Sequence, residues 1–201
     1  MRLPGIQAPA ARSPRLGGIR SRRKSDSVAL ISEQLSDTET EQGKALYDEL
    51  LWVHGVIRRD LNTVQRLAEA VLAGLDPLDL QHELQRLETT GPLWQLKVNC
   101  LRYCRFVHGH HGFEDTAWLP ALRTADPALG PVVERIDEEH QRIAVKLGDV
   151  EAAAAALTDE DSGDTRRQVV DALNAVADDL TEHLAYEELA IGPTLRRMRH
   201  L

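Results

Sequence analysis

The chain of 201 residues is poor in aromatic side chains, which make up 4% of it, and it has only two cysteines. Hydrophobic residues never run unbroken for the roughly 20 positions that a membrane-spanning helix needs. The first segment also lacks the apolar stretch of a secretory signal. Cys100 and Cys104 lie four residues apart on one helical face, where a reduced pair is easier to accommodate than a strained disulfide. We therefore expect a soluble, cytoplasmic protein with no membrane contact.

Positive charge is scarce outside the N-terminal segment. Residues 1–36 carry seven Lys and Arg against two acidic residues, a net of +5, and the remainder carries 17 basic against 30 acidic residues, a net of −13. The acidic body argues against nucleic acid as the main partner. The basic segment is rich in Pro, Gly, Ser and Arg, which predicts a disordered N-terminal arm over 1–36. The remaining residues, 37–201, are expected to form one domain, with a monomer favoured.

Alanine and leucine are abundant, and clusters of Pro and Gly divide the chain, a pattern typical of an all-α protein. The intervening segments predict four long helices, over about 38–73, 93–123, 131–157 and 164–199. A short extra helix, at about 78–88, is expected between the first two long ones. Four long amphipathic helices with short links fold most economically as an up-down-up-down antiparallel four-helix bundle.

Each predicted helix carries a histidine in the middle of its apolar face when side chains are placed at about 100° per residue. These histidines are His54, His110, His140 and His183, and the second and fourth are followed one turn later by Glu114 and Glu187. His111 and Asp115 fall on the margin of the apolar arc, and His108 lies nearer to solvent. Because each of the four histidines is near the midpoint of its helix, an antiparallel bundle brings them to one level.

A single histidine on an apolar face is usually a core residue with a satisfied hydrogen bond, and a purely structural bundle requires all six polar residues to be incidental. Two carboxylates buried together would raise each other's pKa and resist ionising, so a cation is expected between them. Imidazole and carboxylate ligands without thiolate suit iron, manganese or zinc. Four imidazoles and two carboxylates are too many ligands for one tetrahedral zinc ion. They divide naturally over two metal ions, with the carboxylates bridging them. Two iron ions with an oxo or hydroxo bridge are favoured over manganese or zinc.

The segments HHGFEDTAWLP and HLAYEELAIGP repeat one pattern, which is His, three residues, Glu, a second acid, four residues and Pro. With a lone histidine in the helix before each copy, this pattern resembles the hemerythrin-like, or HHE cation-binding, family over about residues 44–199. Ferritin-like di-iron bundles instead use Glu-x-x-His, with closer spacing and reversed order. The resemblance implies one iron on His54 and His110, another on His140 and His183, and bridges from Glu114 and Glu187.

The resemblance also implies a fifth histidine for reversible oxygen carriage, one turn along the third helix. The positions four residues either side of His140 are Ile136 and Ala144. The predicted site is therefore one imidazole short unless another side chain compensates. The candidates for that role are His111, Asp115, Glu139 and Glu188.

Two functions are compatible with this ligand set. The first is a non-haem di-iron protein that binds or reacts with dioxygen, peroxide or nitric oxide, and weak catalase-like decomposition of peroxide would suit a more open iron. The second is an iron-sensing or iron-buffering protein without turnover. Arg58, one turn after His54, is a candidate contact for a bridging acid or bound anion, and Tyr47 and Tyr103 are candidates for lining the pocket.

Overall fold

The computed structural model describes residues 34–74, 92–158 and 163–200. Its long helices are α2 (Glu41–Leu72), α4 (Pro92–Phe113), α6 (Gly130–Ala156) and α7 (Gly163–Leu195). After α4 the chain continues through a π turn, η2 (Glu114–Trp118), into α5 (Leu119–Ala125) and the short 3-10 helix η3 (Pro127–Leu129). The predictions of an all-α protein and of four long helices are confirmed. The predicted short helix at 78–88 lies outside the described residues.

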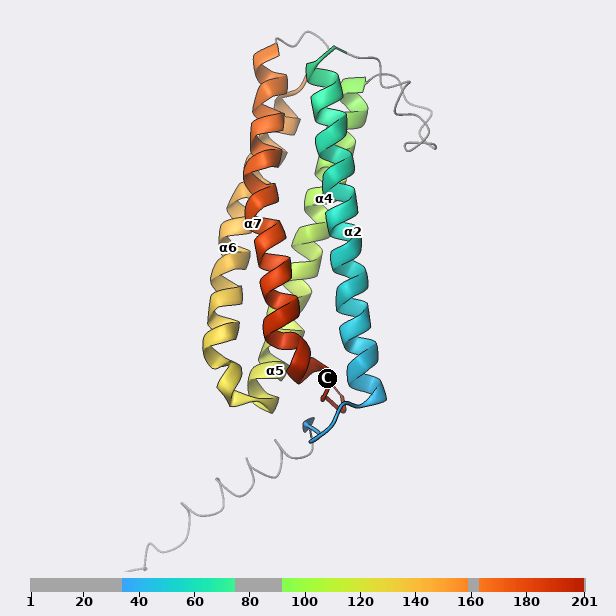
Figure 1. Cartoon of the computed structure of the whole chain (residues 1–201). Coiled ribbons are helices and arrows are strands. Elements are labelled where there is room, and N and C mark those ends of the chain that lie inside the picture. Colours follow the sequence, from blue (N-terminus) through green and yellow to red (C-terminus); the bar gives the residue numbers. More distant parts are fainter. Residues whose placement is uncertain (1–33, 75–91, 159–162, 201) are drawn as a thin grey trace, which may run out of the picture.

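The four long helices stand side by side as a bundle (Figure 1). Helix α2 packs on α4 and α7, and α6 packs on the same two helices. The colours of Figure 1 follow the chain along α2, back along α4, forward along α6 and back along α7. Each long helix can therefore bring its middle turns to the same level as the middle turns of its neighbours.

The first turn of α2 is fixed by its contacts with the end of α7. Thr40 caps α2 by accepting a hydrogen bond from the Gly43 N–H at 2.8 Å, and its own N–H donates to the Arg196 carbonyl at 2.9 Å. A Cβ atom on Gly43 would overlap the backbone of Leu195 and Arg196, so only glycine allows this close approach. Helix α7 ends at Leu195, four residues before the predicted boundary.

Residues after α7 turn back toward the start of the described chain. The Ser36 N–H donates to the Arg197 carbonyl at 2.9 Å, and the Arg199 N–H donates to the Gln34 carbonyl at 3.0 Å. Leu35 forms an isolated β-bridge with Met198. Residues 1–33 of the predicted arm lie outside the described residues, so its boundary at residue 36 stays a prediction.

The bundle has two apolar cores with a polar layer between them. One core includes Ile57 of α2 and Ile143 of α6, and the other includes Leu50 of α2 and Ile136 of α6. His54 lies between the two α2 residues in sequence, and His140 lies between the two α6 residues. Each apolar stripe is therefore interrupted by a buried histidine at one level.

Cys100 and Cys104 are free and lie in the first of these cores. Burial raises the pKa of each thiol to about 12, so both are held as neutral apolar groups at physiological pH. Among the described residues, no helix is both long and apolar enough to cross a membrane.

Candidate metal centre

Seven side chains from the bundle meet at the level of the polar layer. They are five histidines and two glutamates, namely His54, His110, His111, His140, His183, Glu114 and Glu187. All are buried except His110, whose side chain is 9% exposed. The Nε2 atoms of all five histidines have no hydrogen-bond partner among the described residues, and neither do the four carboxylate oxygens of Glu114 and Glu187. Because buried polar atoms are normally paired, their number here indicates a group that the chain does not itself supply.

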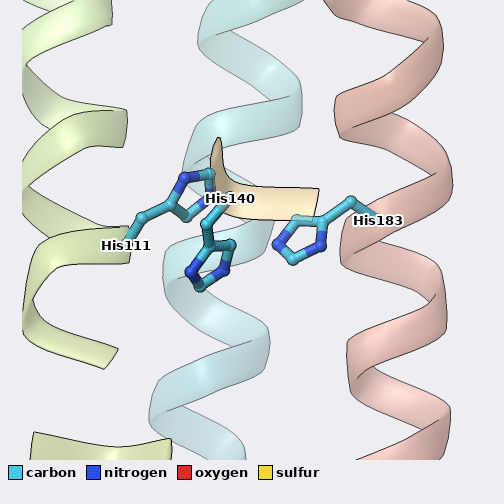
Figure 2. A group of neighbouring side chains, drawn as sticks. All are labelled: His111, His140 and His183. Atoms are coloured by element: carbon cyan, nitrogen blue, oxygen red, sulfur yellow. The ribbon is translucent and has the colours of Figure 1, made fainter. Parts of the chain in front are cut away.

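The side chains form two adjacent sets. His54, His110, Glu114 and Glu187 each have a ligand atom within 4.8 Å of the others, and the same holds for His111, His140 and His183. Figure 2 shows the second set, whose three rings converge from α4, α6 and α7. The rings of His111 and His140 stack with centroids 4.1 Å apart. The structure thus brings together all six residues that the sequence predicts as ligands, and adds His111.

Glu114 lies between the two sets. Its Oε1 is 3.3 Å from the Nε2 of His110, and its Oε2 is 3.6 Å from the Nε2 of His140. The carboxylate therefore turns one oxygen toward a histidine of each set. This is the orientation that a carboxylate needs in order to bridge two cations.

Glu187 also approaches a histidine of each set, but with a single oxygen. Its Oε2 is 3.4 Å from the Nε2 of His54 and 3.7 Å from the Nε2 of His183. Burial, followed by the charge of Glu187, raises the pKa of Glu114 well above its usual range. Burial acts in the same direction on Glu187, but the neighbouring histidines His54, His183 and His140 together outweigh it and lower the pKa of that carboxyl. Two carboxylates ionise together here only when a cation lies between them.

The π turn sets the position of Glu114. The Leu119 N–H donates to the Glu114 carbonyl, five residues back instead of four. Pro120 follows and has no N–H to continue the regular pattern of α-helical bonds. The Thr116 hydroxyl donates to the Gly112 carbonyl at 2.7 Å and so supports the widened turn. Such π turns are frequent at functional sites, and this one carries a candidate bridging acid.

Outside the centre, Glu188 of α7 orients His54 of α2. The Nδ1 of His54 is 2.9 Å from the Oε1 of Glu188, which also accepts a hydrogen bond from Arg58 at 2.7 Å. An acceptor at Nδ1 holds the ring proton on that nitrogen and leaves the Nε2 lone pair directed into the centre. Arg58 therefore contacts the outer acid, and the structure shows no contact of it with either bridging acid.

His140 and His183 have outer acids of the same kind. The Nδ1 of His140 is 2.6 Å from Asp115, and the Nδ1 of His183 is 3.0 Å from Glu139. Arg135 donates to the other oxygen of Glu139 at 2.7 Å. Asp115, Glu139 and Glu188 therefore lie one shell outward, and each fixes a histidine instead of replacing one.

Burial keeps three of these imidazoles neutral. It is the largest cause that lowers the pKa of His110 to about 3, with the nearby His54 adding to the effect. Burial also lowers the pKa of His111 and of His183. Neutral imidazole is the form that binds metal ions, so these side chains are in the ligand state at physiological pH.

Three other residues singled out in the sequence lie away from the centre. His108 is 39% exposed and approaches Glu151 at 4.0 Å, in agreement with its expected position near solvent. Tyr47 packs on Gly192, where a Cβ would overlap its ring, and Arg196 lies 3.9 Å above the ring centre. Tyr103 belongs to the apolar core that contains the two cysteines.

His111 lies where it could offer the imidazole that the sequence of α6 lacks. Position 144, one turn after His140, is alanine, and the His111 ring reaches the same half of the centre from α4. The sequence places His111 only on the margin of the apolar arc, because it is about 100° from His110 on the helix. Both rings reach the centre because it lies between these two directions. The signal in the sequence that could have identified His111 as part of the centre is the adjacent pair His110 and His111 shortly before Glu114.

Fold and site together define a helical bundle with a buried His and Glu centre suited to metal cations. The family model for the hemerythrin HHE cation-binding domain matches residues 45–195. The chain therefore belongs to the hemerythrin HHE cation-binding domain family, and this membership implies that it binds a metal cation. No match to the chain was found among curated proteins or among solved structures.

Proposed function

We propose that the chain binds two metal ions, with iron as the favoured metal, and that this centre binds or reacts with dioxygen, peroxide or nitric oxide. The unpaired Nε2 and carboxylate atoms carry the proposal, since two cations would satisfy all of them at once. Imidazole and carboxylate are ligands that iron accepts, and no cysteine belongs to either set. Manganese and zinc accept the same donor types and are the alternatives to iron.

The two halves of the centre offer unequal numbers of donors. His111, His140 and His183 would hold one ion, and only His54 and His110 would hold the other. With one oxygen from each glutamate, the first half would offer five protein ligands and the second four. The half at His54 and His110 is therefore where an exogenous ligand finds room. When bound, two ferrous ions supply the electrons that reduce dioxygen or peroxide.

The chain's own part is to hold the ligands and to limit access of water. Glu188, Asp115 and Glu139 keep the ring protons of their histidines on Nδ1, pointing outward. The apolar cores on both sides bury most of the layer, which strengthens the charge interactions within it.

The test is to load the protein with iron, reduce it without air, and record stopped-flow absorption spectra after adding dioxygen, peroxide or nitric oxide separately. We expect a spectral change with at least one of them, and its loss in Glu114→Ala and Glu187→Ala. His108→Ala is the matched control and should react like the wild type. Iron binding without any spectral change would favour the sensing or buffering function.

A further inference from the structure

A hollow on the surface between α4 and α6 reaches the inner histidines. It has a volume of about 370 Å³, and its lining includes His111 and His140 together with Asp115 and Asp137. His111 is 4% exposed and its Nε2 has no partner among the described residues. The hollow therefore leads from solvent to a buried, unpaired ligand of the half formed by His111, His140 and His183.

The rim of this hollow is acidic. The side chain of Asp115 is 42% exposed, Asp137 is half-buried, and neither Lys nor Arg belongs to the lining. Arg123 is the nearby cation that acts on Asp137, and it is itself paired with Glu134 at 3.3 Å. A positively charged ion is therefore attracted into the hollow, and an anion is repelled.

Small residues keep the hollow open above the histidines. Ala144 and Gly112 belong to its lining, and a Cβ on Gly112 would meet nothing within 4 Å. The alanine that replaces an imidazole on α6 thus leaves space on the solvent side of His111. With the imidazole on α4 as His111 and a small residue on α6 as Ala144, the centre keeps its ligand and an opening leads to it.

A second hollow, between α6 and α7, has different chemistry. It has a volume of about 340 Å³, and its lining contains His183, two arginines (Arg135 and Arg142) and four carboxylates (Glu138, Glu139, Asp179 and Glu182). Arg135 and His183 both bond Glu139, so this side chain and its partners stand between solvent and the centre. Arg135 and Arg142 lie 2.7 Å and 3.8 Å from Glu139, so two cations stand beside the carboxylate that separates this hollow from His183.

We propose that the hollow between α4 and α6 is the opening through which divalent metal cations reach the centre during loading, with Asp137 as an attracting group at its rim. This inference rests on the proposed function, because it assumes that the centre takes up metal. Asp137 is outside both ligand sets and contributes to the rate of loading, while the histidines and glutamates determine the final occupancy.

The experiment measures the rate of metal uptake. Metal-free protein is mixed with Fe²⁺ without air, and the iron still accessible to a chromogenic chelator is followed in time. Asp137→Asn should slow uptake about three- to tenfold at low salt, within the range of electrostatic steering, and leave final occupancy unchanged. High salt should reduce the difference, since it screens the exposed carboxylate. Ala144→Met, which narrows the hollow, should slow uptake at every salt concentration.

Glu182→Gln is the matched control, because it removes one carboxylate from the hollow between α6 and α7. It should load at the wild-type rate. Normal occupancy with an unchanged rate in Asp137→Asn, or equal slowing in Glu182→Gln, would overturn the inference and leave the proposed function intact. A wild-type protein that takes up no iron would overturn the proposed function itself.

Discussion

At the scale of single residues, the centre is a set of groups that are costly to bury without a cation. An unpaired buried polar group costs about 1–3 kcal/mol, and every Nε2 and carboxylate oxygen of the centre is of this kind among the described residues. Metal binding satisfies these atoms and so couples to folding. The outer acids Asp115, Glu139 and Glu188 each fix the orientation of one histidine ring, so the ligand atoms are already directed into the centre in the folded protein.

The metal-free protein should lose stability as pH falls below about 6.5, the ordinary pKa of histidine. Below this pH the histidines of the unfolded state bind protons. In the folded state His110, with a pKa of about 3, and His111 and His183, with lowered pKa values, stay unprotonated. Glu114 acts oppositely above pH 4.5, because its pKa is raised, but it is one group against three. Thermal unfolding between pH 7 and 5 should show a fall on the order of 1–3 kcal/mol per pH unit.

A matched variant separates these opposing contributions. Glu114→Gln removes the carboxyl whose raised pKa opposes the histidines, so stability should fall more steeply with decreasing pH than in the wild type. A flat profile between pH 6.5 and 5 would mean that the histidines are not buried as neutral groups.

Removing an outer acid should weaken iron binding without removing a ligand. Glu188→Ala deletes the acceptor at the Nδ1 of His54, and the expected loss of iron affinity is about 10- to 100-fold. Glu182→Ala, an exposed acid on the same helix, should bind like the wild type. Competition with a chelator measures both, and equal affinities for the two variants would contradict the role given to Glu188.

At the scale of elements, the helices could be predicted from the sequence, and the local geometry at the centre could not. Clusters of Pro and Gly gave boundaries within a few residues for α2, α6 and the start of α7. The π turn was missed because a wheel of 100° per residue assumes a regular helix, and nothing in Glu114–Trp118 alone signals an i to i+5 bond. His111 was placed on the margin because it is about 100° from His110 on the helix, and periodicity does not show that the centre lies between the two directions. The outer acids depend on side chains that meet across helices, which periodicity does not describe.

The contact between the start of α2 and the end of α7 should depend on one glycine. Gly43→Ala puts a Cβ against the backbone of Leu195 and Arg196, and should cost about 1–3 kcal/mol of the free energy of unfolding. Gly55→Ala in the same helix is the control, because its Cβ would meet nothing within 4 Å and alanine favours helix by about 0.5–1 kcal/mol. Denaturant unfolding compares the two, and equal effects would show that the α2–α7 contact is looser than described.

At the scale of the whole molecule, two apolar cores enclose the polar layer, and the two ends of the described chain close one end of the bundle. Besides the backbone bonds of residues 34–36, the Thr40 hydroxyl donates to the Met198 carbonyl. The centre is built from all four long helices, and this closure joins the start of α2 to the end of α7. Its stability should depend on this closure and not on the predicted N-terminal arm.

Deletions can separate the arm from the closing segment. Removing residues 1–33 should leave the melting temperature and iron content unchanged, because this basic stretch lacks the apolar periodicity to pack on a bundle. Removing residues 1–40 also deletes the Thr40 cap and the bonds of Ser36, and should lower the melting temperature by about 2–8 °C. Calorimetry measures both. A large drop with the shorter deletion would show that the arm is docked.

The most direct test of the central claim is an anaerobic titration of the metal-free protein with Fe²⁺, with bound iron counted per chain. The account predicts about two irons for the wild type and for His108→Ala, from two ligand sets that share two glutamates. For His111→Ala it predicts that one of the two irons binds more weakly than in the wild type, because the half at His140 and His183 loses one of its three imidazoles. A wild type that saturates at one iron, or a His111→Ala variant that still holds two with wild-type affinity, would contradict it.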